Sequence, residues 1–345
     1  MNNRNLAIDW IKGWMIIFVV LIHTWSFQEF HFYLAVDVFF FISGYYLMQS
    51  HMRNPTTTVQ YTWKRIKTIA LPFFICLLFR CCQNWEPFLS PDSYDAAVEK
   101  WSELLCTLSF SERLGLNLSA DQILIGSWYF SVLVIVSFFL YSLLEFNEKL
   151  ATRVLFPAIA LLGFNAMLVH SELFSIWNRV YMLGSPLVRG FTEMATGALI
   201  CSTYQENKAS FEKRSVFINI VGIVSFVLFM ATMFSSRCLD KYLIVTIPWV
   251  LLAAVIDGSW LNKCLERLHG DLFSRIGKYT LYILCAHYPA IIFGNWCNGH
   301  FFNSSLQDVG LVVFDVIFVI PATFLLYIIC KWIRNRIVTR PGIAL

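Results

Sequence analysis

The sequence predicts an all-α, polytopic membrane protein with about ten transmembrane helices. Of its 345 residues, 58% are hydrophobic and only 14% are charged, whereas soluble proteins average about 25% charged residues. The apolar residues gather into runs of about 20, the length of helix that crosses a bilayer. The 32 Phe and 12 Trp residues suit a lipid-facing surface with aromatic belts at its edges.

Ten apolar segments are predicted to span the membrane. Their approximate ranges are 7–27, 31–49, 66–83, 124–144, 154–170, 187–204, 216–236, 242–257, 279–297 and 309–332. The connection 50–67 and the loops on its side hold most of the Lys and Arg residues, and the opposite loops hold few. By the positive-inside rule both termini are then cytoplasmic, in a plasma membrane that we expect to be a bacterial inner membrane.

A single transmembrane domain, residues 1–345, is expected, with no additional soluble domain. The one long connection, residues 84–122, is acidic and is predicted to lie outside. Its middle, AAVEKWSELLCTLSF, has the spacing of a helix with one apolar face. It either lies on the membrane surface or is a plain connection.

Several other classes of protein are disfavoured. A net charge of +4 is too small to indicate nucleic-acid binding. The ten cysteines show no zinc-like spacing, so no metal site is expected. The G-x-S-x-G, Walker A and H-E-x-x-H motifs of soluble enzymes do not occur.

The N-terminal hairpin, residues 4–49, carries polar groups that a merely spanning helix excludes. Lys12 and His23 are eleven residues apart, so at 100° per residue they share one face, roughly 16 Å apart in depth. Folding the hairpin about Glu29 brings Asp37 to the depth of His23. A charged group near the centre of a transmembrane helix raises the free energy of membrane insertion by roughly 2.5–3.5 kcal/mol. We therefore predict that His23 and Asp37 meet in a functional pair; the alternatives are a structural histidine and a helix-capping aspartate.

A specific signature runs through this hairpin. A basic residue, ten residues and a histidine (Lys12 to His23) are followed by Asp-x-Phe-Phe-x-x-Ser-Gly, which begins at Asp37. This combination resembles the acyltransferase family 3 membrane proteins. The resemblance extends over essentially the whole chain, through residues 61–67 with Pro72-Phe73, through Trp128-Tyr129-Phe130, and through residues 276–282 with His287-Tyr288-Pro289.

The resemblance implies an O-acyltransferase that acts on surface polysaccharides. Its reaction would move an acyl group, acetyl in the simplest case, from acyl-CoA to a hydroxyl of a surface glycan or lipid-linked saccharide. Acyl-CoA would be a co-substrate, with no cofactor bound. In this reaction neutral His23 takes the proton from the attacking hydroxyl. Asp37 would hold its tautomer and stabilise the imidazolium.

Four cations are candidates for binding the phosphates of coenzyme A: Lys12, Lys64, Arg65 and Lys67. Two plainer explanations are also open. Lysines near a membrane interface extend their ammonium groups into water, and positive-inside topology alone places cations at this position. The chain departs from the family here, because many members carry a second arginine where this sequence has Thr68.

Four further residues are candidates for contacting the acceptor: Trp128, Arg189, Glu193 and His287. Arg189 and Glu193 are four residues apart, so we expect them to pair with each other, and the pair could form a polar wall for a sugar. His287 is predicted to lie near mid-membrane and to line the same cavity as His23. Trp128 is either a sugar platform or a belt residue.

Two rival functions share these features. A proton-coupled transporter could use His23, Asp37 and His287 as a proton relay. Transporters often show internal repeats with helices broken at matching positions, and no such symmetry is evident in this sequence. The other rival is an N-acyltransferase that modifies an amino sugar.

Overall fold

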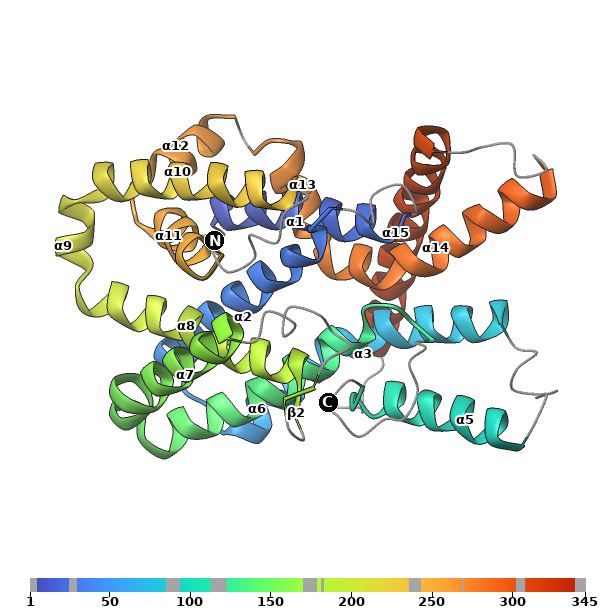
Figure 1. Ribbon diagram of the computed structural model, residues 1–345, viewed down its shortest axis with the longest axis horizontal. Coiled ribbons are helices and arrows are strands. Elements are labelled where there is room, and N and C mark those ends of the chain that lie inside the picture. The colour runs from blue at the N-terminus through green and yellow to red at the C-terminus, as the bar shows by residue number, and fades with distance from the viewer. Residues whose placement is uncertain are drawn as a thin grey trace.

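The computed structural model describes residues 5–24, 30–84, 94–112, 123–169, 179–180, 183–235, 243–268, 270–301 and 308–338. Almost all of these residues are helical (Figure 1). The helices are α1 (Leu6–Ile22), α2 (Ala35–Arg53), α3 (Thr58–Gln83), α5 (Tyr94–Leu108), α6 (Ser127–Leu150), α7 (Phe156–Val169), α8 (Ser185–Glu206), α9 (Lys208–Lys213), α10 (Ser215–Met233), α11 (Leu243–Val255), α12 (Trp260–Arg267), α13 (Leu272–Lys278), α14 (Thr280–Phe301) and α15 (Asp308–Val338). A 3₁₀ turn (Phe32–Leu34) precedes α2, and two short strands, β1 (Arg179–Val180) and β2 (Leu183–Gly184), pair antiparallel before α8.

Each of the ten predicted segments coincides with a helix of the structure. Within the described residues, five stretches are long and apolar enough to cross a membrane. They are Phe32–Arg53, Thr58–Gln83, Ser127–Val169, Ser215–Met233 and Gly310–Arg336. The chain is therefore a helical membrane protein, and a total of ten crossing helices stays a prediction.

The fourth and fifth predicted spans belong to one continuous helical stretch, Ser127–Val169. Asn147, with φ −162° and ψ 99°, interrupts α6, and its side-chain oxygen accepts a hydrogen bond from the Leu150 N–H at 3.0 Å. A π-helical turn, Ala151–Leu155, then leads into α7. The asparagine acts as an internal cap, so the chain changes direction without a separate loop. As a result α6 and α7 both pack against α8.

The most extensive contact between helices joins α2 to α8. Two glycines permit it. Gly44 of α2 lies against the main chain of Met194, and Gly197 of α8 lies against the main chain of Phe41. A Cβ at either glycine would overlap the facing carbonyl group, and such small residues are what let membrane helices approach closely.

A second close crossing joins α1 to α13. Gly13 of α1 lies against the main chain of Phe273, and Gly277 of α13 lies against the main chain of Asp9. The short α13 is thereby held on the first half of α1, and α14, which follows directly, also packs against α1. This arrangement brings the far ends of the sequence together.

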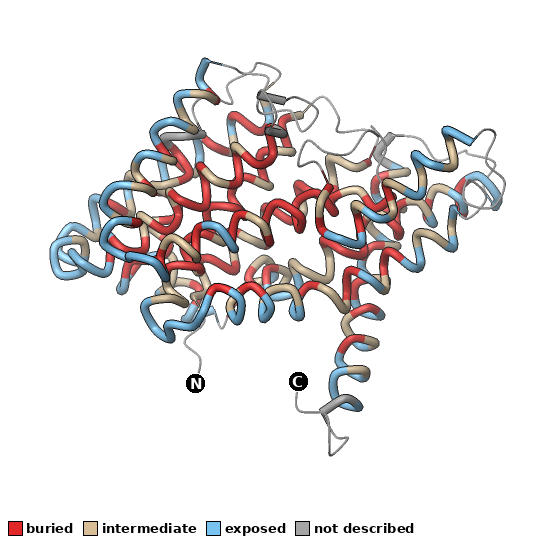
Figure 2. Tube along the Cα trace, turned by 90° about the horizontal axis from the view of Figure 1, so that it is seen from below, coloured by how far each residue is buried: buried red, intermediate tan, exposed pale blue. Residues whose placement is uncertain are grey.

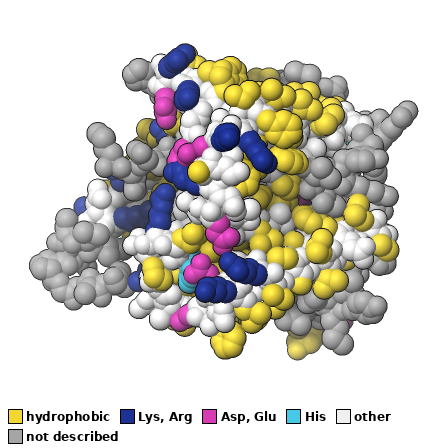
Figure 3. Space-filling view, turned by 90° about the vertical axis from the view of Figure 1, so that its left-hand side faces the viewer, with side chains coloured by type: hydrophobic (Ala, Val, Ile, Leu, Met, Phe, Trp, Pro, Cys, Tyr) yellow, Lys and Arg dark blue, Asp and Glu magenta, His cyan; other side chains and the backbone are white. Residues whose placement is uncertain are grey.

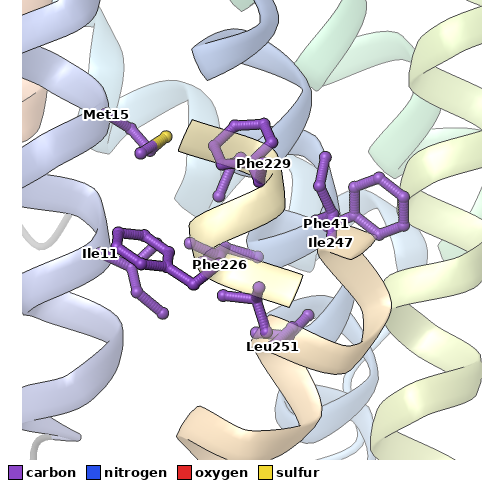
Figure 4. A pocket seen from close by; sticks show the side chains of 10 residues that line it. Ile11, Met15, Phe41, Phe226, Phe229, Ile247 and Leu251 are labelled. Atoms are coloured by element: carbon purple, nitrogen blue, oxygen red, sulfur yellow. The ribbon is translucent and has the colours of Figure 1, made fainter. Parts of the chain in front are cut away.

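The interior between α1, α2, α10 and α11 is closely packed. Figure 4 shows its apolar side chains, which come from all four helices and include Ile11, Met15, Phe41, Phe229 and Leu251. The space that they leave is about 10 Å³, which is at the lower limit for holding a single water molecule. This region is therefore core and no ligand site.

Apolar side chains also cover the outside of the bundle. Leu161 and Leu162 of α7 are each 71% exposed, and Ile317 and Leu325 of α15 are 57% and 59% exposed. Figure 2 shows the same division along many helices, with one side buried and the other exposed. An exposed apolar surface of this kind suits contact with lipid chains.

The turn through α9 marks a polar edge of the molecule. Lys208, Glu212, Lys213 and Arg214 are all exposed there. Figure 3 views the molecule from the side on which α9 lies, and charged side chains form a strip beside an apolar area. The charge pattern of the sequence predicts that this edge is cytoplasmic.

Candidate active site

Two histidines from opposite ends of the sequence meet inside the bundle. His23 caps the C-terminal end of α1, and His287 lies within α14, where it is fully buried. Their ring centroids are 4.9 Å apart, with the planes tilted by 54°. The structure therefore places His287 beside His23, and a cavity that both residues line stays a prediction.

The hydrogen bonds of both rings define their tautomers. His23 Nδ1 lies 2.6 Å from the Val19 carbonyl oxygen, and His287 Nδ1 lies 2.9 Å from the Leu284 carbonyl oxygen. A carbonyl oxygen only accepts, so each Nδ1 carries the hydrogen and each neutral ring keeps its lone pair on Nε2. The Nε2 of His287 is buried and has no hydrogen-bond partner among the described residues. Two basic nitrogens are thus available at one place in the bundle.

The start of α6 lies beside the histidine pair. Gly126 adopts φ +92°, a conformation that side-chain-bearing residues rarely take. A Cβ at this position would lie 3.8 Å from Cε1 of His287. Trp128 follows, but it is only 6% exposed and packs near Phe40, with 6.3 Å between ring centroids. Its indole belongs to the buried interior in this structure, and its contact with a sugar stays a prediction.

Asp37 binds a partner that sequence reasoning missed. Arg189 Nε donates to Asp37 Oδ1 at 2.9 Å, and the guanidinium makes a second bond to the same oxygen. Both side chains are buried. The sequence predicts Glu193 as the partner of Arg189, because the two lie on one face of a helix. No intrahelical spacing could have indicated a bond between α2 and α8. A contact between His23 and Asp37 stays a prediction.

Glu193 lies one turn beyond Arg189 and is also buried. It interacts electrostatically with both Asp37 and Arg189, and its Oε2 has no hydrogen-bond partner within the described residues. Two carboxyl groups and one guanidinium therefore lie close together inside the bundle. Such a polar cluster is unusual in a membrane interior and marks a candidate functional position.

The four predicted phosphate-binding cations have different surroundings in the structure. Lys12 Nζ lies 3.2 Å from Asp9 Oδ1, and this carboxylate offsets its charge. Arg65 turns inward, where its guanidinium donates to the Ser137 hydroxyl of α6 and lies over the Tyr61 ring.

The other two cations lie on the outside of α3. Lys64 and Lys67 are exposed, and the Lys67 ammonium group lies 5.4 Å from the centroid of the Trp63 ring. Arg65 and Lys67 are two residues apart, so they point about 160° away from each other around the helix. A joint phosphate site formed by all four residues stays a prediction that this geometry does not favour.

Asp315 is an intramembrane carboxyl group that sequence reasoning passed over. It lies on α15 and is fully buried, and neither carboxyl oxygen has a hydrogen-bond partner among the described residues. Its Oδ1 faces Gly294 of α14. The signal was present in the sequence, because Asp315 interrupts the apolar run Gly-Leu-Val-Val-Phe-Asp-Val-Ile-Phe.

Glu112 attaches the long connection between α3 and α6 to the bundle. It is buried, and it accepts hydrogen bonds from Thr107 at the end of α5 and from Ser127 at the start of α6. The predicted helix in this connection is present as α5. The Glu112 contacts hold it against the same turn of α6 that borders His287.

Comparison with known proteins agrees with these observations. A family model described as an acyltransferase domain, that of acyltransferase family 3, matches residues 5–332. No curated protein and no solved structure gives a match in the corresponding comparisons. The matched range begins before α1 and ends within α15, so it contains both histidines and the Asp37–Arg189 pair. Because the match covers nearly the whole chain, this protein belongs to acyltransferase family 3.

Proposed function

We propose that the protein transfers an acyl group, acetyl in the simplest case, from acyl-CoA to a hydroxyl of a surface glycan or lipid-linked saccharide. The single observation that supports this proposal most is the His23–His287 pair, in which both Nδ1–H groups are engaged by main-chain carbonyls. The protein would act in the plasma membrane, with both termini cytoplasmic. Membership of the family supports an acyltransferase activity.

The proposed reaction uses His23 as the general base. Its Nε2 accepts the proton of the acceptor hydroxyl as that oxygen attacks the thioester carbonyl carbon. The new C–O bond forms, the C–S bond breaks, and the imidazolium returns the proton to the departing thiolate. The Val19 carbonyl accepts from Nδ1–H throughout, so the ring keeps its orientation. His287, 4.9 Å away between centroids, would share the transient positive charge.

The buried cluster of Asp37, Arg189 and Glu193 would hold the acceptor side of the site. The Asp37–Arg189 bond fixes α2 to α8, and Glu193 keeps one carboxyl oxygen available for a hydroxyl. Carboxyl and guanidinium groups bind sugar hydroxyls through directed hydrogen bonds. Exposed Lys64 and Lys67 would attract the anionic donor on the predicted cytoplasmic side.

The test is His23→Ala in the purified protein. Thiol release from acetyl-CoA in the presence of acceptor should fall by about two to four orders of magnitude, while size-exclusion behaviour stays that of the wild type. His51→Ala is the matched control, because His51 lies near the C-terminal end of α2, 3.4 Å from Glu148. Full activity of His23→Ala would exclude the general-base role. Substrate counterflow without acyl transfer would favour the transporter.

A further inference from the structure

A groove of about 530 Å³ runs between α1, the α13–α14 segment and α15. Ile17 and Val20 line it from α1, Ile283 from α14, and Val316, Val319 and Ile320 from α15. It differs from the interior in Figure 4, where side chains leave almost no free space. The groove has the size of a binding site for a small molecule or for one arm of a larger ligand.

The groove leads toward the histidine pair. Val20 precedes His23 by three residues on α1, and Ile283 precedes His287 by four residues on α14. One end of the groove is therefore about one helical turn below both imidazoles. A chain lying in the groove would present its end to the two basic Nε2 atoms.

Arg275 lies at the other end, on the predicted cytoplasmic side. It is exposed and lines the groove. Tyr327 of α15 lies at the same end, beside Tyr279. From Val316 to Tyr327 the groove follows eleven residues of one helix, which is roughly 16 Å. An extended phosphopantetheine arm, from phosphate to thioester, has a comparable length. A guanidinium is also well suited to bind a phosphate.

Polar atoms occur between these two ends. Thr323 lines the groove and is 8% exposed, yet its hydroxyl has no hydrogen-bond partner among the described residues. A buried hydroxyl without a partner carries a desolvation penalty, which a ligand carbonyl would remove. Tyr279 and Tyr327 also line the groove, and their ring centroids are 5.3 Å apart.

We propose that this groove holds the phosphopantetheine arm of the acyl-CoA donor. Arg275 binds its phosphate, the Thr323 hydroxyl donates to an amide carbonyl, and the apolar end places the thioester at His23 and His287. This inference rests on the proposed function and adds to it the path of the donor. It also replaces Lys12 and Arg65 as phosphate ligands, because Asp9 and Ser137 already engage them.

The test is calorimetric titration of acetyl-CoA into the purified protein in detergent. Ile320→Trp fills the groove and should weaken donor binding by at least about tenfold. Ile317→Trp is the matched control, since Ile317 is an exposed apolar residue on the same helix that does not line the groove. Thr323→Val should weaken binding about fivefold, and Thr323→Ser should restore it. Arg275→Gln should weaken binding and reduce its dependence on salt.

The outcomes separate this inference from the proposed function. If the wild type binds acetyl-CoA and Ile320→Trp, Thr323→Val and Arg275→Gln bind it equally well, the groove proposal is wrong and the acyl-CoA reaction stands. If the wild type does not bind acetyl-CoA, the proposed donor itself is wrong. Loss of co-purifying phospholipid from Ile320→Trp, with acetyl-CoA binding unchanged, would make the groove a lipid site and overturn the proposal.

Discussion

At the scale of single residues, the interior is organised by polar pairs that join different helices. His23 and His287 join α1 to α14, and Asp37 and Arg189 join α2 to α8. Within a membrane-spanning bundle each such group must find a partner in the protein, because lipid chains offer none. The same groups that permit chemistry therefore also determine which helices lie together.

Arg189 gives the clearest test at this scale. Arg189→Met leaves Asp37 and Glu193 as buried carboxyl groups without their guanidinium, so we expect a loss of about 3–5 kcal/mol of unfolding free energy. The double variant Asp37→Leu/Arg189→Met should regain a large part of the lost unfolding free energy, because removing both partners removes the unpaired charge. Thermal unfolding in detergent measures both. Arg153→Met is the control, since Arg153 is exposed; equal melting of Arg189→Met and Arg153→Met would contradict the structural role of the pair.

At the scale of elements, close helix crossings and a few polar ties determine the packing. The α2–α8 crossing depends on Gly44 and Gly197, and it carries the Asp37–Arg189 bond across the same interface. The α3–α6 contact depends on polar bonds instead, among them Arg65 to Ser137 and Thr58 to Glu145. These two kinds of contact predict different responses to substitution.

Gly197→Ala tests the close crossing. Its Cβ would overlap the Phe41 carbonyl of α2, so the helices must separate, and we expect a loss of about 1–3 kcal/mol. Activity should fall as well, because the separation moves Arg189 relative to Asp37. Thr203→Ala, at an exposed position of the same helix, should change neither quantity. Unfolding curves and initial rates, measured on the same samples, decide the matter; a fully active and stable Gly197→Ala protein would show that the crossing tolerates a methyl group.

Arg65 and Lys64 test whether the cations of α3 serve structure or donor binding. Arg65→Ala removes the bond to Ser137 and should lower the Tm, whereas Lys64→Ala removes an exposed side chain and should leave the Tm unchanged. Differential scanning fluorimetry and KM for acetyl-CoA are measured on both variants. A raised donor KM in Arg65→Ala with an unchanged Tm would restore Arg65 as a phosphate ligand.

At the scale of the whole molecule, an apolar exterior and a charged edge at α9 suit a bundle that crosses a membrane. The charge pattern of the sequence predicts that the α9 edge is cytoplasmic. In our proposal the groove and the histidine pair form one path from the predicted cytoplasmic side into the bundle. This path runs between the first helix and the last two helices. A donor from the cytoplasm would follow it.

Topology labelling tests this orientation. A cysteine-reactive, membrane-impermeant reagent should label residue 55 and the C-terminus from the cytoplasmic side only, and residue 95 from the outside only. Both internal positions are exposed, Pro55 between α2 and α3 and Asp95 at the start of α5. A cysteine at Lys213, exposed at the end of α9, is the control and should label with residue 55. Labelling of residues 55 and 95 from the same side would contradict the ten-span arrangement.

The sequence by itself determined the class of the protein. Long apolar runs and a low charge content are sufficient to predict membrane helices, because the bilayer admits little else. The hairpin signature from Lys12 to Gly44 was sufficient to predict the family, which the match over residues 5–332 confirms. His23, Asp37 and His287 also stood out from sequence, because ionisable groups are rare in such segments.

Only the tertiary structure decided which of these groups meet. Helical periodicity tells which residues of one helix share a face. It therefore predicted that Arg189 pairs with Glu193 and that the cations of α3 act together. It contains no information on the angles at which helices cross. Those angles depend on close contacts such as Gly197 with Phe41 and Gly277 with Asp9, which form between segments far apart in the chain. The Asp37–Arg189 bond and the groove follow from these crossings, as does the inward turn of Arg65. They could be seen only once the helices had been packed together.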